Sequence, residues 1–95
     1  EKAMIIGVVA GNVWATRKDE GLKGLKLLVF KPIDYYTQGE HSTFVAADFI
    51  GAGIGETVLV ATGSSARKVL NKESSPIDAT VVGIIDTVEV EKAMT

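Results

Sequence analysis

The chain has 95 residues, which is enough for a single domain, expected to span residues 1–95, and too short for two. Ten Lys and Arg against twelve Asp and Glu give a formal net charge of −2, so the chain lacks the basic field that neutralises a nucleic-acid backbone. It has no cysteine, which excludes disulfides, thiolate metal sites and a cysteine nucleophile.

The chain is more apolar than a domain of this size can hide. Hydrophobic residues make up 46% of it, and the mean hydropathy is +0.24. A small domain buries only about 60–65% of the surface that its unfolded chain exposes. Contacts between subunits absorb such a surplus, so the composition favours an oligomer. No apolar run reaches the roughly 20 residues of a membrane span, and no signal peptide is recognisable, so we expect a cytoplasmic protein with no membrane partner.

Five runs rich in Val, Ile, Thr and aromatic residues predict five β-strands. They cover residues 4–16, 25–33, 42–50, 56–63 and 79–92. Their spacing, with Gly, Pro, Asp and Ser between them, is typical of an antiparallel barrel or sandwich rather than of βαβ units. Gly7 and Gly11 in the first run and Gly83 in the last predict bulges or sharp coiling, which a small sheet needs if it is to close.

One short helix is predicted between the fourth and fifth strands of this all-β chain. Ser64 or Ser65 can cap its N-terminus, and Ala66 and Leu70 then share one face. The polar residues 71–76 end it.

The glycine-rich stretch "GAGIGE" (51–56) does not predict a nucleotide site. A dinucleotide fingerprint needs a helix after its glycines, because the helix N-terminus holds the pyrophosphate. Here the β-forming "ETVLVA" follows. We expect a tight turn whose glycines adopt positive φ or let another backbone approach closely.

The remaining motifs offer little to catalysis. "SARK" (65–68) matches the S-x-x-K of serine acyl-transferases, but that chemistry needs further motifs on a longer chain. His41 is the only histidine and cannot build a metal site alone. We therefore expect no enzyme activity, no cofactor and no metal. Trp14 and Phe30 are expected to fill the core or an interface.

Three segments, 7–34, 45–67 and 76–90, resemble the vertex proteins of bacterial microcompartment shells, the EutN/CcmL family of carboxysomes and of ethanolamine- and propanediol-type compartments. The resemblance covers nearly the whole chain. It is carried by the ordered set "VWAT", "KLL", "GAGxGExVL", "GSSAR" and "PxDAxVVGIxD". Phe49 departs from the family, which often has a smaller residue there.

The resemblance implies a five-stranded barrel similar to an OB-fold that assembles as a cyclic homopentamer. Such pentamers occupy the fivefold vertices of a polyhedral shell, beside hexameric shell proteins of a different fold. Flat hexagonal tiling cannot close, so fivefold corners are needed. The family has no catalytic activity, which implies a structural protein in a cytoplasmic microcompartment shell.

Two segments are predicted to lie at the subunit interface or the fivefold axis. The first contains Gly51, Gly53, Gly55 and Glu56, and the second contains Gly63, Ser64, Ser65 and Arg67. The glycines of the first are expected to shape a corner where neighbouring chains approach closely. Arg67 is the natural partner for a neighbour's carboxylate, for instance that of Glu56 or Asp48, in a contact that repeats around the ring.

The alternative is an OB-like module that binds single-stranded nucleic acid or an oligosaccharide. That class stacks bases on aromatic side chains along a cationic groove. The net charge of −2 and only six aromatic residues argue against nucleic acid.

Overall fold

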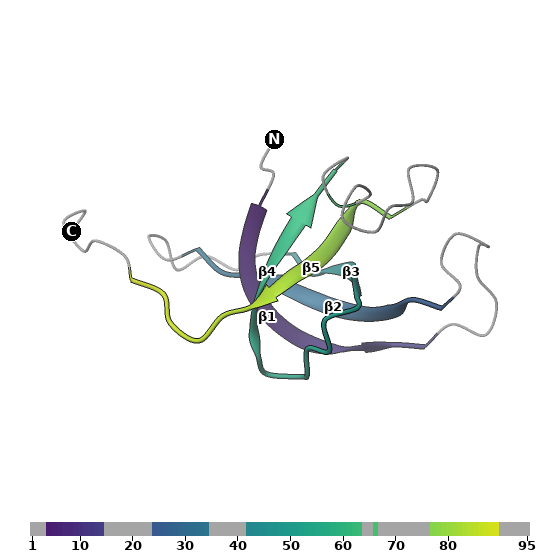
Figure 1. Cartoon of the computed structure of the whole chain (residues 1–95), viewed down its shortest axis with the longest axis horizontal. Coiled ribbons are helices and arrows are strands. Elements are labelled where there is room, and N and C mark those ends of the chain that lie inside the picture. The colour runs from purple at the N-terminus through teal and green to yellow at the C-terminus, as the bar shows by residue number, and fades with distance from the viewer. Residues whose placement is uncertain (1–3, 15–23, 35–41, 64–65, 67–76, 90–95) are drawn as a thin grey trace.

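The computed structural model describes residues 4–14, 24–34, 42–63, 66 and 77–89, which carry five strands (Figure 1). The strands are β1 (Met4–Val13), β2 (Lys26–Pro32), β3 (Phe44–Asp48), β4 (Thr57–Thr62) and β5 (Ala79–Ile84). Each falls within one of the five predicted runs, so the all-β prediction is confirmed. The predicted helix lies outside the described residues except for Ala66. No helix in the described part of the chain is long and apolar enough to cross a membrane.

The strands form a closed barrel in the order β1-β2-β3-β5-β4. Four neighbouring pairs are antiparallel, but β3 and β5 pair in parallel, through Ala47 with Thr80 and Asp48 with Val81. The predicted antiparallel pairing is therefore confirmed for four pairs and wrong for the pair β3–β5. The reason is geometric: an odd number of strands cannot alternate in direction all the way round a closed ring.

The ten-residue strand β1 pairs with two neighbouring strands, and it bends between them. Its first half pairs with β4 and its second half with β2, and the register with β2 shifts between Val9 and Gly11. A second shift separates the pairs Leu59–Gly83 and Val60–Val81 of β4 and β5. The predicted irregularities beside Gly11 and Gly83 are thus confirmed, and bulges of this kind supply the coiling that closes a small barrel.

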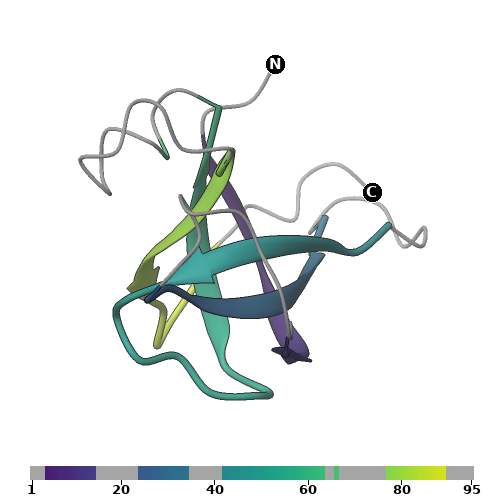
Figure 2. The same cartoon turned by 90° about the vertical axis from the view of Figure 1, so that its right-hand side faces the viewer.

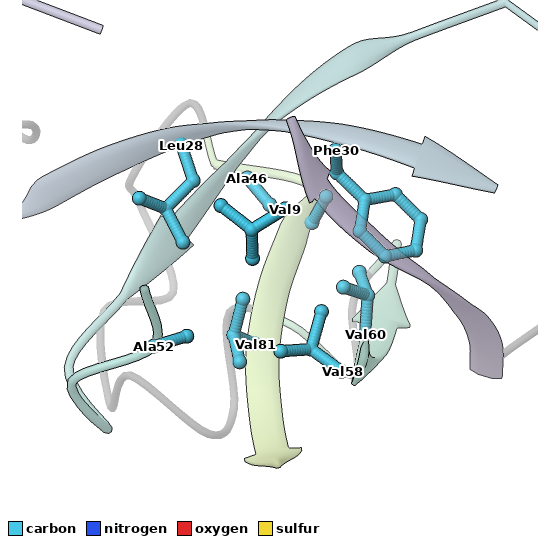
Figure 3. Close-up of a cluster of buried hydrophobic side chains, with 9 residues drawn as sticks. Val9, Leu28, Phe30, Ala46, Ala52, Val58, Val60 and Val81 are labelled. Atoms are coloured by element: carbon cyan, nitrogen blue, oxygen red, sulfur yellow. The ribbon is translucent and has the colours of Figure 1, made fainter. Parts of the chain in front are cut away.

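The barrel is filled by alternate residues of its strands, because successive side chains of a strand point to opposite faces (Figure 3). The buried cluster consists of Val9, Leu28, Phe30, Ala46, Ala52, Val58, Val60, Ala79 and Val81. The ring of Phe30 lies 5.0 Å from that of Phe44, so the core prediction for Phe30 is confirmed. Trp14 is 88% exposed and is no part of this chain's core.

A smaller buried cluster lies on the other side of the sheet. It joins Leu27 and Ala47 from neighbouring strands to Ala66 and Ile77 from the connection between β4 and β5. The Thr80 hydroxyl donates to the Ala66 carbonyl oxygen at 3.3 Å. Ala66 and Ile77 therefore cover part of the outer face of β2 and β3.

The third and fifth strands end earlier than their apolar runs. β3 ends at Asp48, where the side chain takes over the backbone hydrogen bonds that follow. β5 ends at Ile84, opposite Val58 near the start of β4, and the Ile85 amide makes a last bond to the Thr57 carbonyl at 2.8 Å. A strand needs a partner, and beyond Ile85 β4 has no further residue to pair with.

Gly7 should be intolerant of any side chain. A Cβ there would collide with the Lys31 carbonyl oxygen and the Phe30 ring, whereas a Cβ on Gly83 would meet nothing within 4 Å. We expect Gly7→Ala to lower the free energy of unfolding by about 3 kcal/mol, as overpacking against backbone does. Gly83→Ala is the matched control and should change it by less than ~1 kcal/mol. Urea denaturation of both variants, at one protein concentration, measures the difference; equal stabilities would contradict the close approach at Gly7.

Candidate functional site

The segment between β3 and β4, residues 49–56, turns the chain at the lower end of the barrel in Figure 2. We call it the corner. It follows Asp48, the last residue of β3, which is 2% exposed. Asp48 Oδ1 accepts from the amides of Ile50 (2.9 Å) and Gly51 (3.2 Å), and Oδ2 accepts from the amide of Ala52 (2.9 Å). An Asp side chain that caps the following amides replaces strand pairing with a turn, and this turn brings Ala52 into the core.

The buried carboxylate also has a cation beside it. Lys26 pairs with Asp48 across β2 and β3, and its Nζ lies 3.8 Å from Asp48 Oδ2. The same ammonium donates to the Ala52 carbonyl oxygen at 2.9 Å. Buried charges persist in proteins when they are paired and hydrogen-bonded, and both conditions hold here.

The second half of the corner is fastened to β1 at its bulge. The Gly55 amide donates to the Val9 carbonyl at 2.8 Å, and the Val9 amide donates to the Glu56 carbonyl at 3.0 Å. Within the corner, the Gly53 amide donates to Glu56 Oε1 at 2.6 Å. The corner is therefore held at both ends and across its middle.

Two of the predicted turn glycines occupy backbone conformations that favour glycine. Gly51 has φ +100° and Gly55 has φ +92°, in the left-handed region that L side chains rarely adopt. Gly53 is not among the positive-φ glycines, and a Cβ there would make an ordinary contact with Glu56 Oε1 at 3.5 Å. The expected tight turn is confirmed. Its first and last glycines, Gly51 and Gly55, are the ones whose backbone conformation favours glycine.

The corner presents three large apolar side chains to solvent, which we call the apolar tip. Phe49 is 53% exposed, Ile50 44% and Ile54 64%. Large apolar side chains gathered on one segment mark an interaction site more often than singly exposed ones do. A segment fixed by so many hydrogen bonds holds them in a defined arrangement.

A hollow of about 580 Å³ lies at the strand ends remote from the corner. Its walls come from the beginnings of β1, β3 and β5 and the end of β4: Ile5, Phe44, Val45, Thr62, Gly63, Asp78 and Ala79. The Gly63 amide donates to the Asp78 carbonyl at 2.8 Å. Its walls combine apolar side chains with Thr62 and with Asp78, an exposed residue.

The structure separates the two predicted interface segments. Gly51, Gly53, Gly55 and Glu56 gather in the corner, while Gly63 borders the hollow. Ser64, Ser65 and Arg67 lie outside the described residues, as does His41.

One predicted pairing is corrected by the geometry. Asp48 was expected as a possible partner for the Arg67 of a neighbouring chain. Its carboxylate is buried and already accepts three amides of its own chain, so it is not open to a neighbour. The exposed Glu56 remains available for that role.

The context of the glycine stretch and the arrangement of the described polar side chains bear on two kinds of site, a dinucleotide site and a metal site. The glycine stretch leads into β4 and not into a helix, as expected for a turn that does not hold a dinucleotide. Within the described ranges, no three His, Asp or Glu side chains gather to hold a metal ion.

Asp48 and Lys26 build the corner, and neither was predicted from the sequence to do so. An Asp at a strand end, followed by a glycine three residues on, is a signal for a side-chain-capped turn. The exposure of Phe49, Ile50 and Ile54 had no such signal, because exposed and buried apolar residues look alike in a short run.

Comparison with known proteins gives a consistent result. The family model "Ethanolamine utilisation protein EutN/carboxysome" matches residues 4–86. The chain is 50% identical over 86 residues to the bacterial microcompartment shell vertex protein GrpN of Rhodospirillum rubrum, across 90% of this chain and 97% of that protein. It is 46% identical over 88 residues to the carboxysome shell vertex protein CcmL of Synechococcus elongatus, across 93% and 89%.

Solved structures of microcompartment and carboxysome shell proteins resemble the chain as well. The pentameric microcompartment shell protein GrpN from Rhodospirillum rubrum matches with a TM-score of 0.80 at 47% identity, across 92% of this chain and 99% of that one. The CcmL structure from Gloeobacter violaceus matches with a TM-score of 0.82 at 45% identity, across 92% and 90%.

Removing the Asp48 carboxylate should release the corner. We expect Asp48→Ala to lower the free energy of unfolding by roughly 2–4 kcal/mol, because it leaves the buried Ala52 amide without its acceptor and the other two amides without theirs. Asp86→Ala, at an exposed carboxylate after β5, is the control and should stay within ~0.5 kcal/mol. Urea denaturation at a fixed protein concentration makes the comparison. Equal losses in the two variants would mean that Asp48 does not hold the corner.

Proposed function

The chain belongs to the EutN/CcmL family, and we propose that it is a shell vertex protein, a homopentamer that caps the fivefold vertices of a bacterial microcompartment. The observation that carries this is the 50% identity to a shell vertex protein over 97% of that protein's length. The 47% identity to a pentameric shell protein with the same fold adds to it.

The described surface suits a ring subunit. A cyclic ring above two members joins each chain to its neighbours through two different patches. We propose that the corner belongs to one such patch and the segment that begins at Gly63 to the other. The high apolar content of the chain also fits a protein that buries surface against its own copies.

A structural role leaves no need for catalysis. The relatives are named as shell vertex proteins, and we infer that this chain likewise has no enzyme activity and binds no cofactor. Its further partners are inferred to be the hexameric shell proteins that surround a vertex. Nucleic acid is not among them, because the net charge is −2 and binding of a phosphate backbone is dominated by basic residues.

Native mass spectrometry of the purified chain tests the assembly directly. We expect a species at five times the 10.0 kDa chain mass, stable on dilution, with light scattering across a concentration series giving the same mass. A chain that stays monomeric at all concentrations, alone and with shell hexamers added, would overturn the proposal.

Arg67 is proposed to pair across the ring with the carboxylate of a neighbour's Glu56. Arg67→Glu replaces an attraction by a like-charge repulsion, which costs several kcal/mol at an interface. We expect the pentamer to dissociate at a protein concentration at least ~10-fold higher than in the unmodified chain. Lys31→Glu, a charge reversal on the exposed side of β2, is the control. An unchanged pentamer in Arg67→Glu would remove Arg67 from the interface.

A further inference from the structure

We propose that the segment after β5 pairs as an added strand with the open edge of β1 in the next copy of the chain. The segment is residues 85–89, which we call the tail. The edge is residues 10–13 on the side of β1 that faces β4, which we call the β1 edge. The inference rests on the homopentamer proposed above and names one contact between its subunits. The partner is a second copy of this chain.

The tail has the sequence of a strand but no strand partner. Valines alternate with glutamates in "VEVE" (88–91), and this period of two is typical of a strand with one apolar face. Yet β5 ends at Ile84. After the bond from the Ile85 amide to the Thr57 carbonyl, no residue of 86–89 makes a hydrogen bond or ion pair with another described residue. The pattern therefore needs a backbone from elsewhere to pair with.

The β1 edge is a strand edge that the rest of the barrel leaves open. Strand pairing with β4 occupies this side of β1 from Met4 to Val8, and the corner bonds to Val9. Beyond Val9, within the described part of the chain, β1 is paired on its other side only, with β2. Residues 10–13, "AGNV", contain neither a charge nor a proline, two devices that commonly protect an edge from pairing with another chain.

Trp14 lies directly after the β1 edge and is 88% exposed. The sequence predicted a place in the core or in an interface, and the structure excludes the core of its own chain. Exposed tryptophan is enriched at the centres of protein interfaces. A strand laid along the β1 edge brings β-branched side chains beside Trp14, and cross-strand pairs of aromatic and β-branched residues stabilise sheets.

The direction in which each segment leaves the barrel makes the contact one between copies. In Figure 1 the tail runs to the left, while the end of β1 runs to the right. β4 also separates β1 from β5 in the barrel. Each chain can therefore give its tail to one neighbour and receive the tail of another. Such a head-to-tail contact generates a ring when its rotation closes, and a 47% identical relative is pentameric.

β3 offers the competing edge, and it is less accessible. β3 pairs with β5 only through its last two residues, so residues 44–46 are open on that side within the described ranges. They face the start of β5 across the hollow, and an added strand would have to fit between two strands of one barrel. The β1 edge has no strand opposite it, and its Ala10 and Asn12 are exposed. Strand addition is therefore favoured at β1.

Cross-linking tests the pairing, and the absence of cysteine from the chain keeps the test clean. Glu89→Cys and Asn12→Cys, both at exposed positions, are made as separate chains and mixed under conditions that exchange subunits. A short bis-maleimide, whose reach tolerates a small shift in register, is then added. We expect a covalent heterodimer in the mixture and none in either chain alone.

The matched control moves the second thiol to the competing edge. Val45→Cys, at a position that is 47% exposed on β3, replaces Asn12→Cys in the mixture with Glu89→Cys. The heterodimer yield should fall at least ~10-fold, because thiols are bridged only when their backbones lie close together. Equal yields, or a higher yield with Val45→Cys, would overturn the assignment to β1.

A second measurement tests whether the contact is a strand. Thr87→Pro and Val88→Pro each remove one amide donor from the tail. The amides of successive strand residues point to opposite edges, so only one of the two faces the partner. We expect that variant to raise the concentration at which the pentamer dissociates by at least ~10-fold, as loss of an interface hydrogen bond does. The other variant and the controls Thr87→Ala and Val88→Ala should change it far less.

The outcomes separate this contact from the proposed function. Equal effects of the two proline variants, whether both are silent or both weaken the ring, would overturn strand pairing. If the unmodified chain is pentameric but no cross-link joins the tail to β1, the contact fails and the vertex function stands. If the unmodified chain forms no pentamer, alone or with shell hexamers, the vertex function itself fails.

Discussion

The corner depends on one buried carboxylate. Asp48 ends β3, accepts three amides of the residues that follow, and pairs with Val81 in the parallel seam that closes the barrel. A buried charge costs several kcal/mol unless hydrogen bonds and an opposite charge compensate it. Here the amides and Lys26 do so. The side chain of Asp48 shapes the corner, while its backbone belongs to the strand pairing that closes the sheet.

Much of the fold could be predicted from local patterns, because strand periodicity and turn residues are local properties. The five strands and the core position of Phe30 follow from them. The parallel pairing of β3 with β5 does not, because the direction of two strands distant in sequence is fixed by the closure of the whole ring. The early end of β3 is likewise a competition between side chain and backbone that an apolar run conceals.

The candidate site could be predicted in part. Glycine spacing indicated a tight turn, and Gly51 and Gly55 have the positive φ that such a turn requires. The sequence left Asp48 open as a partner for another chain, whereas burial makes it an internal acceptor. Nor could composition tell that Phe49 and Ile54 face solvent while Ala52 between them is buried, since that order results from how the turn is tied to Asp48 and β1.

The short parallel seam has a consequence for assembly in the cell. Only two residue pairs join β3 to β5, and Asp48, the residue before the corner, belongs to one of them. β5 is also the last strand among the described residues, and it leaves the ribosome after the other four. The closed barrel can therefore form only once the whole chain through β5 is available.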